Sequence, residues 1–207
     1  MTKNRQGADS TGIDMSMKKT IAIVIFSFCL ALTFMHGRAE ARESDPFKLP
    51  QVGVWFGPIT PVYETRKEVD TALGGGAFVR VNLGQSPFKL GMDGSYQKYK
   101  SKSLNEVKLV PLYGSILYRL PFSSLLVFQL KLGAGGSYIK AFPINKSQWD
   151  PLFVGGGEMS FPLGATAAIG LRVEYLMLYE KHISGAKKNG NFVNTGLSIN
   201  FNLDMFD

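Results

Sequence analysis

Cysteine is almost absent from this chain: its 207 residues contain one, Cys29, which lies inside an N-terminal apolar segment. The remainder of the chain therefore has no thiol with which to form a disulfide or a thiolate metal site. We expect neither a bound metal nor a cofactor.

Long apolar runs are also missing after residue 35, and the mean hydropathy is only +0.03. A helical membrane protein would be far more hydrophobic, so helical insertion of the main part of the chain is not expected. The 23 glycines and the 12% of aromatic residues are instead typical of a sheet protein with many turns.

The basic residues form no cluster along the sequence. The chain has 23 Lys and Arg against 16 Asp and Glu, a formal charge of +7. These positive charges are scattered over strands and loops, without a stripe or a known binding motif, so nucleic acid is not an expected partner. Contact with acidic lipid headgroups explains the charge better.

The N-terminal segment has the organisation of an export signal. Lys18 and Lys19 precede the apolar stretch 20–35, and Ala39-Glu40-Ala41 is a small-x-small cleavage site. We expect residues 1–16 to be disordered or not translated, 17–41 to be a signal peptide, and 42–207 to be the mature domain. The alternative is an uncleaved anchor, but 16 apolar residues are fewer than the ~20 that span a bilayer.

The C-terminal residues 194–205 alternate strictly between apolar and polar side chains. This period of two predicts a β-strand between two different environments, and further segments repeat it. The expected strands cover approximately residues 50–60, 72–83, 87–99, 106–120, 125–141, 151–162, 165–182 and 191–205. Together they predict an all-β fold, an eight-stranded antiparallel up-and-down barrel spanning a bacterial outer membrane, with apolar residues facing lipid. A soluble sandwich or lipocalin-like barrel is the alternative, with the apolar face inside.

The expected connections alternate in length, which is typical of outer-membrane barrels. Connections two, four and six carry Gly, Pro and Ser turn residues, whereas connections one, three, five and seven are longer and charged. Both ends of the barrel then face the periplasm. The outer loops contain the basic residues Arg66, Lys67, Lys100, Lys102, Lys187 and Lys188. We expect them to contact lipopolysaccharide, acidic glycans or another extracellular ligand.

Charged residues also occur at positions that alternation places inside the barrel. These candidate lumen residues are Arg80, Lys89, Asp93, Lys131, Glu158, Arg172 and Glu174. A charge in a narrow lumen loses water and needs a partner of opposite sign, so we expect a salt-bridged plug. A gated ion path built from the same pairs, and hence a small-solute pore, is the alternative.

A family resemblance rests on residues 156–175. Gly156-Gly157-Glu158, a turn, and Ala168-Ile169-Gly170-Leu171-Arg172-Val173-Glu174-Tyr175 resemble the sixth and seventh strands of OmpA-like small barrels. The resemblance implies an eight-stranded outer-membrane domain with a lumenal pair formed by Glu158 and Arg172. The terminal aromatic of such barrels stands one place early, at Phe206, and the barrel-assembly machinery is an expected partner.

A second resemblance concerns residues 179–186, whose His182-Ile183-Ser184 is similar to the H-x-S-N-A segment of PagL-type lipid A deacylases. It implies an esterase in which Ser184 is the nucleophile and His182 the general base. The family's Asn is replaced by Gly185 and its downstream acid is missing, which leaves Glu180 as a substitute. The sequence therefore favours a structural or surface-interaction barrel over a deacylase.

Overall fold

The computed structural model describes residues 49–100, 106–121, 126–142, 145–164, 166–179 and 189–203. The predicted signal peptide and the segment before it lie outside these residues. Within the described part, no helix is long and apolar enough to cross a membrane.

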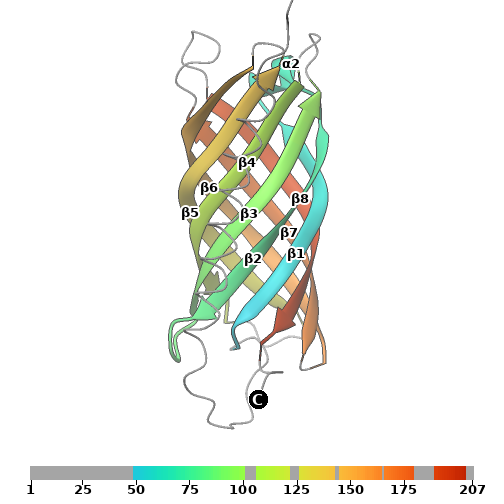
Figure 1. Ribbon diagram of the computed structural model, residues 1–207. Coiled ribbons are helices and arrows are strands. Elements are labelled where there is room, and N and C mark those ends of the chain that lie inside the picture. Colours follow the sequence, from blue (N-terminus) through green and yellow to red (C-terminus); the bar gives the residue numbers. More distant parts are fainter. Residues whose placement is uncertain are drawn as a thin grey trace, which may run out of the picture. The chain divides into compact units, whose positions relative to one another are not determined.

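Eight antiparallel strands form a closed barrel in which each strand pairs with the next and β1 pairs with β8 (Figure 1). The strands are β1 (Gln51–Pro61), β2 (Ala72–Asn82), β3 (Phe88–Lys100), β4 (Glu106–Arg119), β5 (Val127–Phe142), β6 (Lys146–Leu163), β7 (Ala167–Tyr179) and β8 (Asn189–Asn202). Closure leaves no strand edge unpaired, as a sheet in hydrocarbon requires. The predicted eight-stranded up-and-down barrel is confirmed.

The outside of the barrel is apolar. On β5, Leu132 is 72% exposed whereas the preceding Lys131 is buried. On β8, Leu197 is 64% exposed whereas Asn200, three residues further along, is buried. This is the expected orientation of the alternating faces, with polar residues directed into the lumen. The soluble alternative is wrong, because a water-soluble barrel would direct its apolar face inward, whereas large apolar side chains such as Leu132 and Leu197 are exposed on the outside.

Two sequence predictions about the connections need correction. Strand β6 begins at Lys146 rather than near residue 151, and β5 continues to Phe142, so connection five comprises only residues 143–145. Connection three, residues 101–105, is also short. The strand pairing of this hairpin continues beyond Tyr138 and Trp149 to Ala141 and Lys146. Residues that were predicted to form a loop therefore belong to β5 and β6. Connections one and seven remain the longest.

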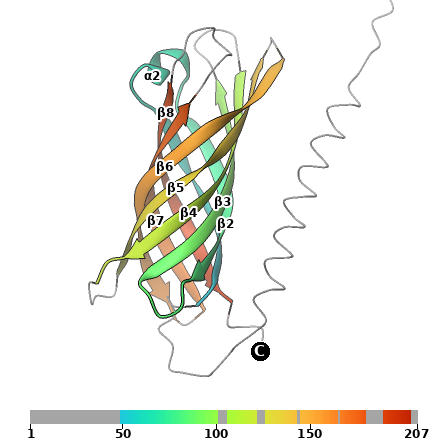
Figure 2. The same cartoon turned by 90° about the vertical axis from the view of Figure 1, so that its left-hand side faces the viewer.

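The first connection contains a short helix, α2 (Thr65–Glu68), that the sequence did not predict (Figure 2). The loop is tied to β8, because the backbone N–H of Val62 donates to the Asn191 carbonyl at 2.9 Å and the Asn191 N–H donates to Thr65 Oγ1 at 2.9 Å. Directly after α2, Val69 is buried and belongs to the apolar cluster inside the barrel. The loop thus contributes a side chain to the core at this end, which we call the outer end.

Candidate functional site: a charged network in the lumen

One half of the lumen network surrounds Lys131 and Arg172. The Lys131 ammonium donates to Asp93 Oδ1 at 2.6 Å and to Glu174 Oε1 at 2.8 Å. Arg172 Nη2 donates to the same two carboxylates, at 3.1 Å to Asp93. The Tyr113 hydroxyl donates to Glu174 Oε2 at 3.3 Å and accepts from Lys131 at the same distance. Two cations therefore share two carboxylates at the centre of the barrel.

The other half is a paired Arg80 and Glu158. Arg80 donates from Nη1 and Nη2 to the two Glu158 oxygens, at 3.1 and 2.6 Å. This two-point geometry is the strongest form of a charge-assisted hydrogen bond. Glu158 also accepts from Ser198 and Asn200, at 3.4 and 3.2 Å. The carboxylate thus accepts hydrogen bonds from β2 and from β8.

The six charges balance, with three cations and three carboxylates, and all six side chains are buried. Such charges lose their hydration and remain ionised only because each has a close partner. Aromatic rings cover the guanidinium groups: Arg80 lies 4.1 Å from the Phe78 ring centroid, and Arg172 lies 4.8 Å from that of Trp55. The six side chains therefore form an assembly with no net charge, closed off by aromatic rings.

The glycine at position 170 makes room for this assembly. A methyl group there would overlap Ser198 Oγ and would lie 3.0 Å from Glu158 Oε1 and 3.2 Å from Ser160 Oγ. The bare backbone of β7 therefore allows the carboxylate to approach the wall.

Lys89, the seventh predicted lumen residue, lies apart from the network. Its ammonium donates to Gln51 Oε1 at 2.8 Å, and Gln51 Nε2 donates to Asn202 Oδ1 at 3.0 Å. Because Gln51 begins β1 and Asn202 ends β8, this polar group lies at the end of the lumen opposite the outer end.

The predicted contact between Glu158 and Arg172 is wrong. The two residues are opposite each other on β6 and β7, as the hairpin requires. Their side chains nevertheless bond elsewhere: Glu158 to Arg80, and Arg172 to Asp93 and Glu174. Long side chains in a narrow barrel reach across the lumen, so adjacency in the sheet does not determine ion pairing.

An apolar cluster fills the outer part of the lumen, and the sequence analysis missed it. Its buried members include Ile59, Tyr99, Leu109, Ile139, Leu152, Leu176, Leu178 and Phe192. Alternation could have revealed it, because Leu176 and Leu178 have the same parity as Arg172 and Glu174 on β7. The lumen is therefore apolar towards the outer end, charged in the middle and polar at the opposite end.

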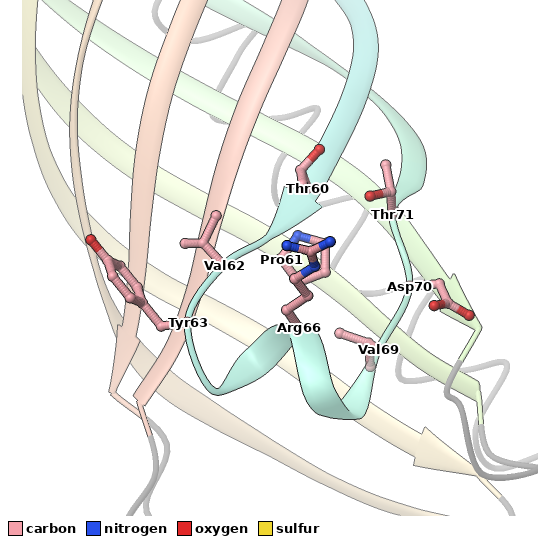
Figure 3. A pocket seen from close by; sticks show the side chains of 8 residues that line it. All are labelled: Thr60, Pro61, Val62, Tyr63, Arg66, Val69, Asp70 and Thr71. Carbon is pink, nitrogen blue, oxygen red and sulfur yellow. The ribbon is translucent and has the colours of Figure 1, made fainter.

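A small hollow of about 480 Å³ lies in the first connection, beside α2 (Figure 3). Arg66 and Asp70 are among its lining residues, together with Tyr63, whose φ of 54° is unusual for a residue other than glycine. One cation and one carboxylate do not make a catalytic constellation.

Arg66 and Lys67 are both exposed on α2, as expected for loop residues, and Lys67 pairs with Glu64 at 2.9 Å.

Several predicted residues lie outside the described part of the chain. They are the deacylase candidates Glu180, His182 and Ser184 and the loop lysines Lys102, Lys187 and Lys188. Lys100 is described, and it is the last residue of β3 rather than part of a loop. Among the described residues, no three His, Cys, Asp or Glu side chains are arranged to hold a metal ion.

Known proteins resemble this chain in structure but not in sequence. No protein-family model matches it, and no curated protein matches its sequence. The crystal structure of Neisserial surface protein A matches with a TM-score of 0.59 at 8% identity, over 74% of this chain and 96% of that one. Ail of Yersinia pestis matches at 0.51 and 12%, and a major outer membrane protein of Thermus thermophilus at 0.52 and 8%, each over 74% of this chain and 98% of its own.

The shared fold and the apolar outside wall define the class: this is a small eight-stranded β-barrel of the outer-membrane type. Its location is the bacterial outer membrane, where such a wall faces lipid. The resemblance of residues 156–175 to small outer-membrane barrels indicated the correct architecture.

Proposed function

We propose that this protein is a non-conducting barrel with a structural and surface-interaction role and without catalysis of its own. The observation that carries the proposal is the layering of the lumen, in which the charged network lies directly below the apolar cluster. An eight-stranded barrel leaves room for little besides its side chains.

The two layers oppose ion flow for different reasons. An ion entering the network would have to compete with pairs such as Arg80 and Glu158, whose charges are already matched at 2.6 Å. An ion or water molecule in the outer layer would meet apolar side chains, and hydrophobic constrictions exclude water. Buried Val69, from the first connection, adds to this layer.

We expect the folded barrel to be electrically silent in planar lipid bilayers. A porin inserted in the same bilayer serves as the positive control, and detergent alone as the negative one. Discrete current steps from the wild-type barrel, reproduced in independent preparations, would replace the proposal with a small-solute pore.

The exposed cations of the first connection support a role at the cell surface. Arg66 and Lys67 lie on α2, which hydrogen bonds between its loop and β8 hold in place. Loops displayed by a rigid scaffold are the usual carriers of recognition. We propose that these residues contribute to binding acidic glycans, lipopolysaccharide saccharides among them.

Exchanging Arg66 and Lys67 together for Gln should weaken binding of a polysulfated oligosaccharide about thirtyfold at low salt, since each cation near an anionic surface contributes roughly 1 kcal/mol. The loss should be smaller at high salt because of screening. Isothermal titration calorimetry measures both. Glu68→Gln, in the same helix, is the matched control and should strengthen binding; unchanged affinity and salt dependence in the double variant would exclude the loop as a binding surface.

A further inference from the structure

Three lysines form an unbroken row on the outside of the barrel. Lys98 on β3 is directly opposite Lys108 on β4, which is directly opposite Lys140 on β5. On all three strands the even-numbered residues face outward, as the exposed Tyr96, Ile116 and Leu132 show. Like charges in directly opposed positions destabilise a sheet, so this row needs an explanation.

The chain neutralises the row only in part. Glu106, in the adjacent row, lies 2.9 Å from Lys98 Nζ and 3.4 Å from Lys108 Nζ. The Phe142 ring centroid lies 5.0 Å from both Lys108 Nζ and Lys140 Nζ. Three lysines and one glutamate leave two net positive charges, and half of the Lys98 side chain is exposed.

Aromatic residues lie immediately below the row and define its depth in the membrane. Two residues before Lys98 and Lys140 along their strands stand Tyr96 and Tyr138, and Tyr138 is opposite Trp149 with ring centroids 5.8 Å apart. Outward-facing Tyr and Trp occupy the level of the lipid headgroups. The lysines, one step further out, therefore lie at the level of headgroup phosphates in the outer leaflet.

Small residues follow on the next outward positions. Gly94 and Gly136 are both opposite Leu112, and Gly114 is opposite Ala134 one step deeper. A methyl group at Gly94 would meet only Leu112 Cδ1 at 3.6 Å, and one at Gly114 only a carbonyl oxygen at 4.0 Å. Packing within the barrel therefore does not demand glycine at either position, and the glycines and Ala134 add little side-chain bulk to the outside wall between Leu112 and the exposed Met92.

We propose that Lys98, Lys108 and Lys140 bind the phosphate groups of a lipid A-type glycolipid in the outer leaflet. The proposal requires the outer-membrane location but neither the closed lumen nor the loop interaction proposed above. The two positive charges that Glu106 leaves uncompensated attract an anionic headgroup with two phosphates, and its acyl chains would lie along the outside wall below the row. The row is at the outer end of the barrel, since the Asp70 N–H of the first connection donates to the Lys100 carbonyl at 3.0 Å.

The test places the folded barrel in phosphatidylcholine vesicles that contain increasing fractions of fluorophore-labelled, bis-phosphorylated lipid A. Energy transfer from Trp149, which lies beside the row, reports binding. The triple variant Lys98→Gln, Lys108→Gln and Lys140→Gln should weaken binding about a hundredfold, from three cations at a phosphate surface. Equal transfer in the wild type and the triple variant would overturn the proposal.

A matched control removes one charge elsewhere at the outer end, by Lys146→Gln, an exposed residue at the start of β6, and is compared with Lys108→Gln. Lys146→Gln should change binding less than twofold; a loss equal to that of Lys108→Gln would show that net charge alone determines binding and would reject the site. Lys108→Gln, at the centre of the row, provides a second test with little risk to folding and should weaken binding about fivefold. No change in this variant would also count against the row.

Four competitors identify the recognised chemistry. Unlabelled bis-phosphorylated lipid A should displace the probe, whereas lipid A without phosphates and millimolar inorganic phosphate should not. Displacement by dephosphorylated lipid A would assign the binding to acyl chains, and displacement by phosphatidylglycerol at equal charge would reduce it to a general preference for anionic lipid. Either result rejects the proposed site.

Discussion

Replacing Glu158 by Gln should lower the free energy of unfolding by about 3 kcal/mol, at the low end of what is found when one partner of a buried ion pair is removed. The Arg80 side chain that remains is fully buried and would lose its two charge-assisted hydrogen bonds. Urea unfolding of the barrel in lipid vesicles, followed by tryptophan fluorescence, measures the change.

The exposed pair on the outside wall provides the matched control for this substitution. Glu106→Gln is the same chemical change at a side chain that is 33% exposed, and it should alter stability by less than about 1 kcal/mol because exposed ion pairs contribute little. The double variant Arg80→Met with Glu158→Leu should recover part of the loss, since no unpaired charge remains. If Glu158→Gln were as mild as Glu106→Gln, the lumen network would not stabilise the fold.

Replacing Leu132 by Arg should destabilise the barrel by roughly 2–4 kcal/mol in a phospholipid bilayer, the cost of a cation near the midplane of a barrel's lipid face. Leu132 is 72% exposed and lies between the outward aromatic residues Phe128 and Tyr138 of β5. The same unfolding measurement applies, with the protein inserted in vesicles.

The control for Leu132 is another leucine on the outside wall but at its edge. Leu163 is the last residue of β6 and is 47% exposed, so Leu163→Arg should cost only about 0–1 kcal/mol. Equal costs at the two positions would mean that depth in a bilayer does not govern the outside wall, which would contradict the assigned orientation.

Much of the fold could be predicted because alternation is a property of each strand by itself. Every second residue of a strand shares a face, so the parity of Leu197, Ile199 and Phe201 defined the lipid side of β8 before any partner strand was considered. The predicted start of β6 was wrong, because the residues there do not alternate between apolar and polar side chains. Residues 146–150 are mostly polar, and only their pairing with the end of β5 makes them part of β6.

Six of the seven predicted lumen residues belong to the network, but the contacts among them were not predicted. Parity placed Glu158, Arg172 and Lys131 inside the barrel, and the structure brings these residues together in one network. The assignment of partners required the register of strands far apart in the chain: Arg80 on β2 reaches Glu158 on β6, with three strands between them in sequence. The apolar cluster was not predicted, because all residues facing the lumen were expected to be polar. The alternation along each strand nevertheless places the residues of this cluster on the lumen side.

The sequence by itself determined which side of each strand meets lipid and which charged residues must find partners inside, because these consequences follow from a two-residue repeat and from the cost of burying a charge. The tertiary structure alone decided which cations meet which carboxylates, how the lumen divides into layers, and that three lysines from three strands stand in one row. Those features depend on register and closure, which arise from pairings between distant segments rather than from any local pattern.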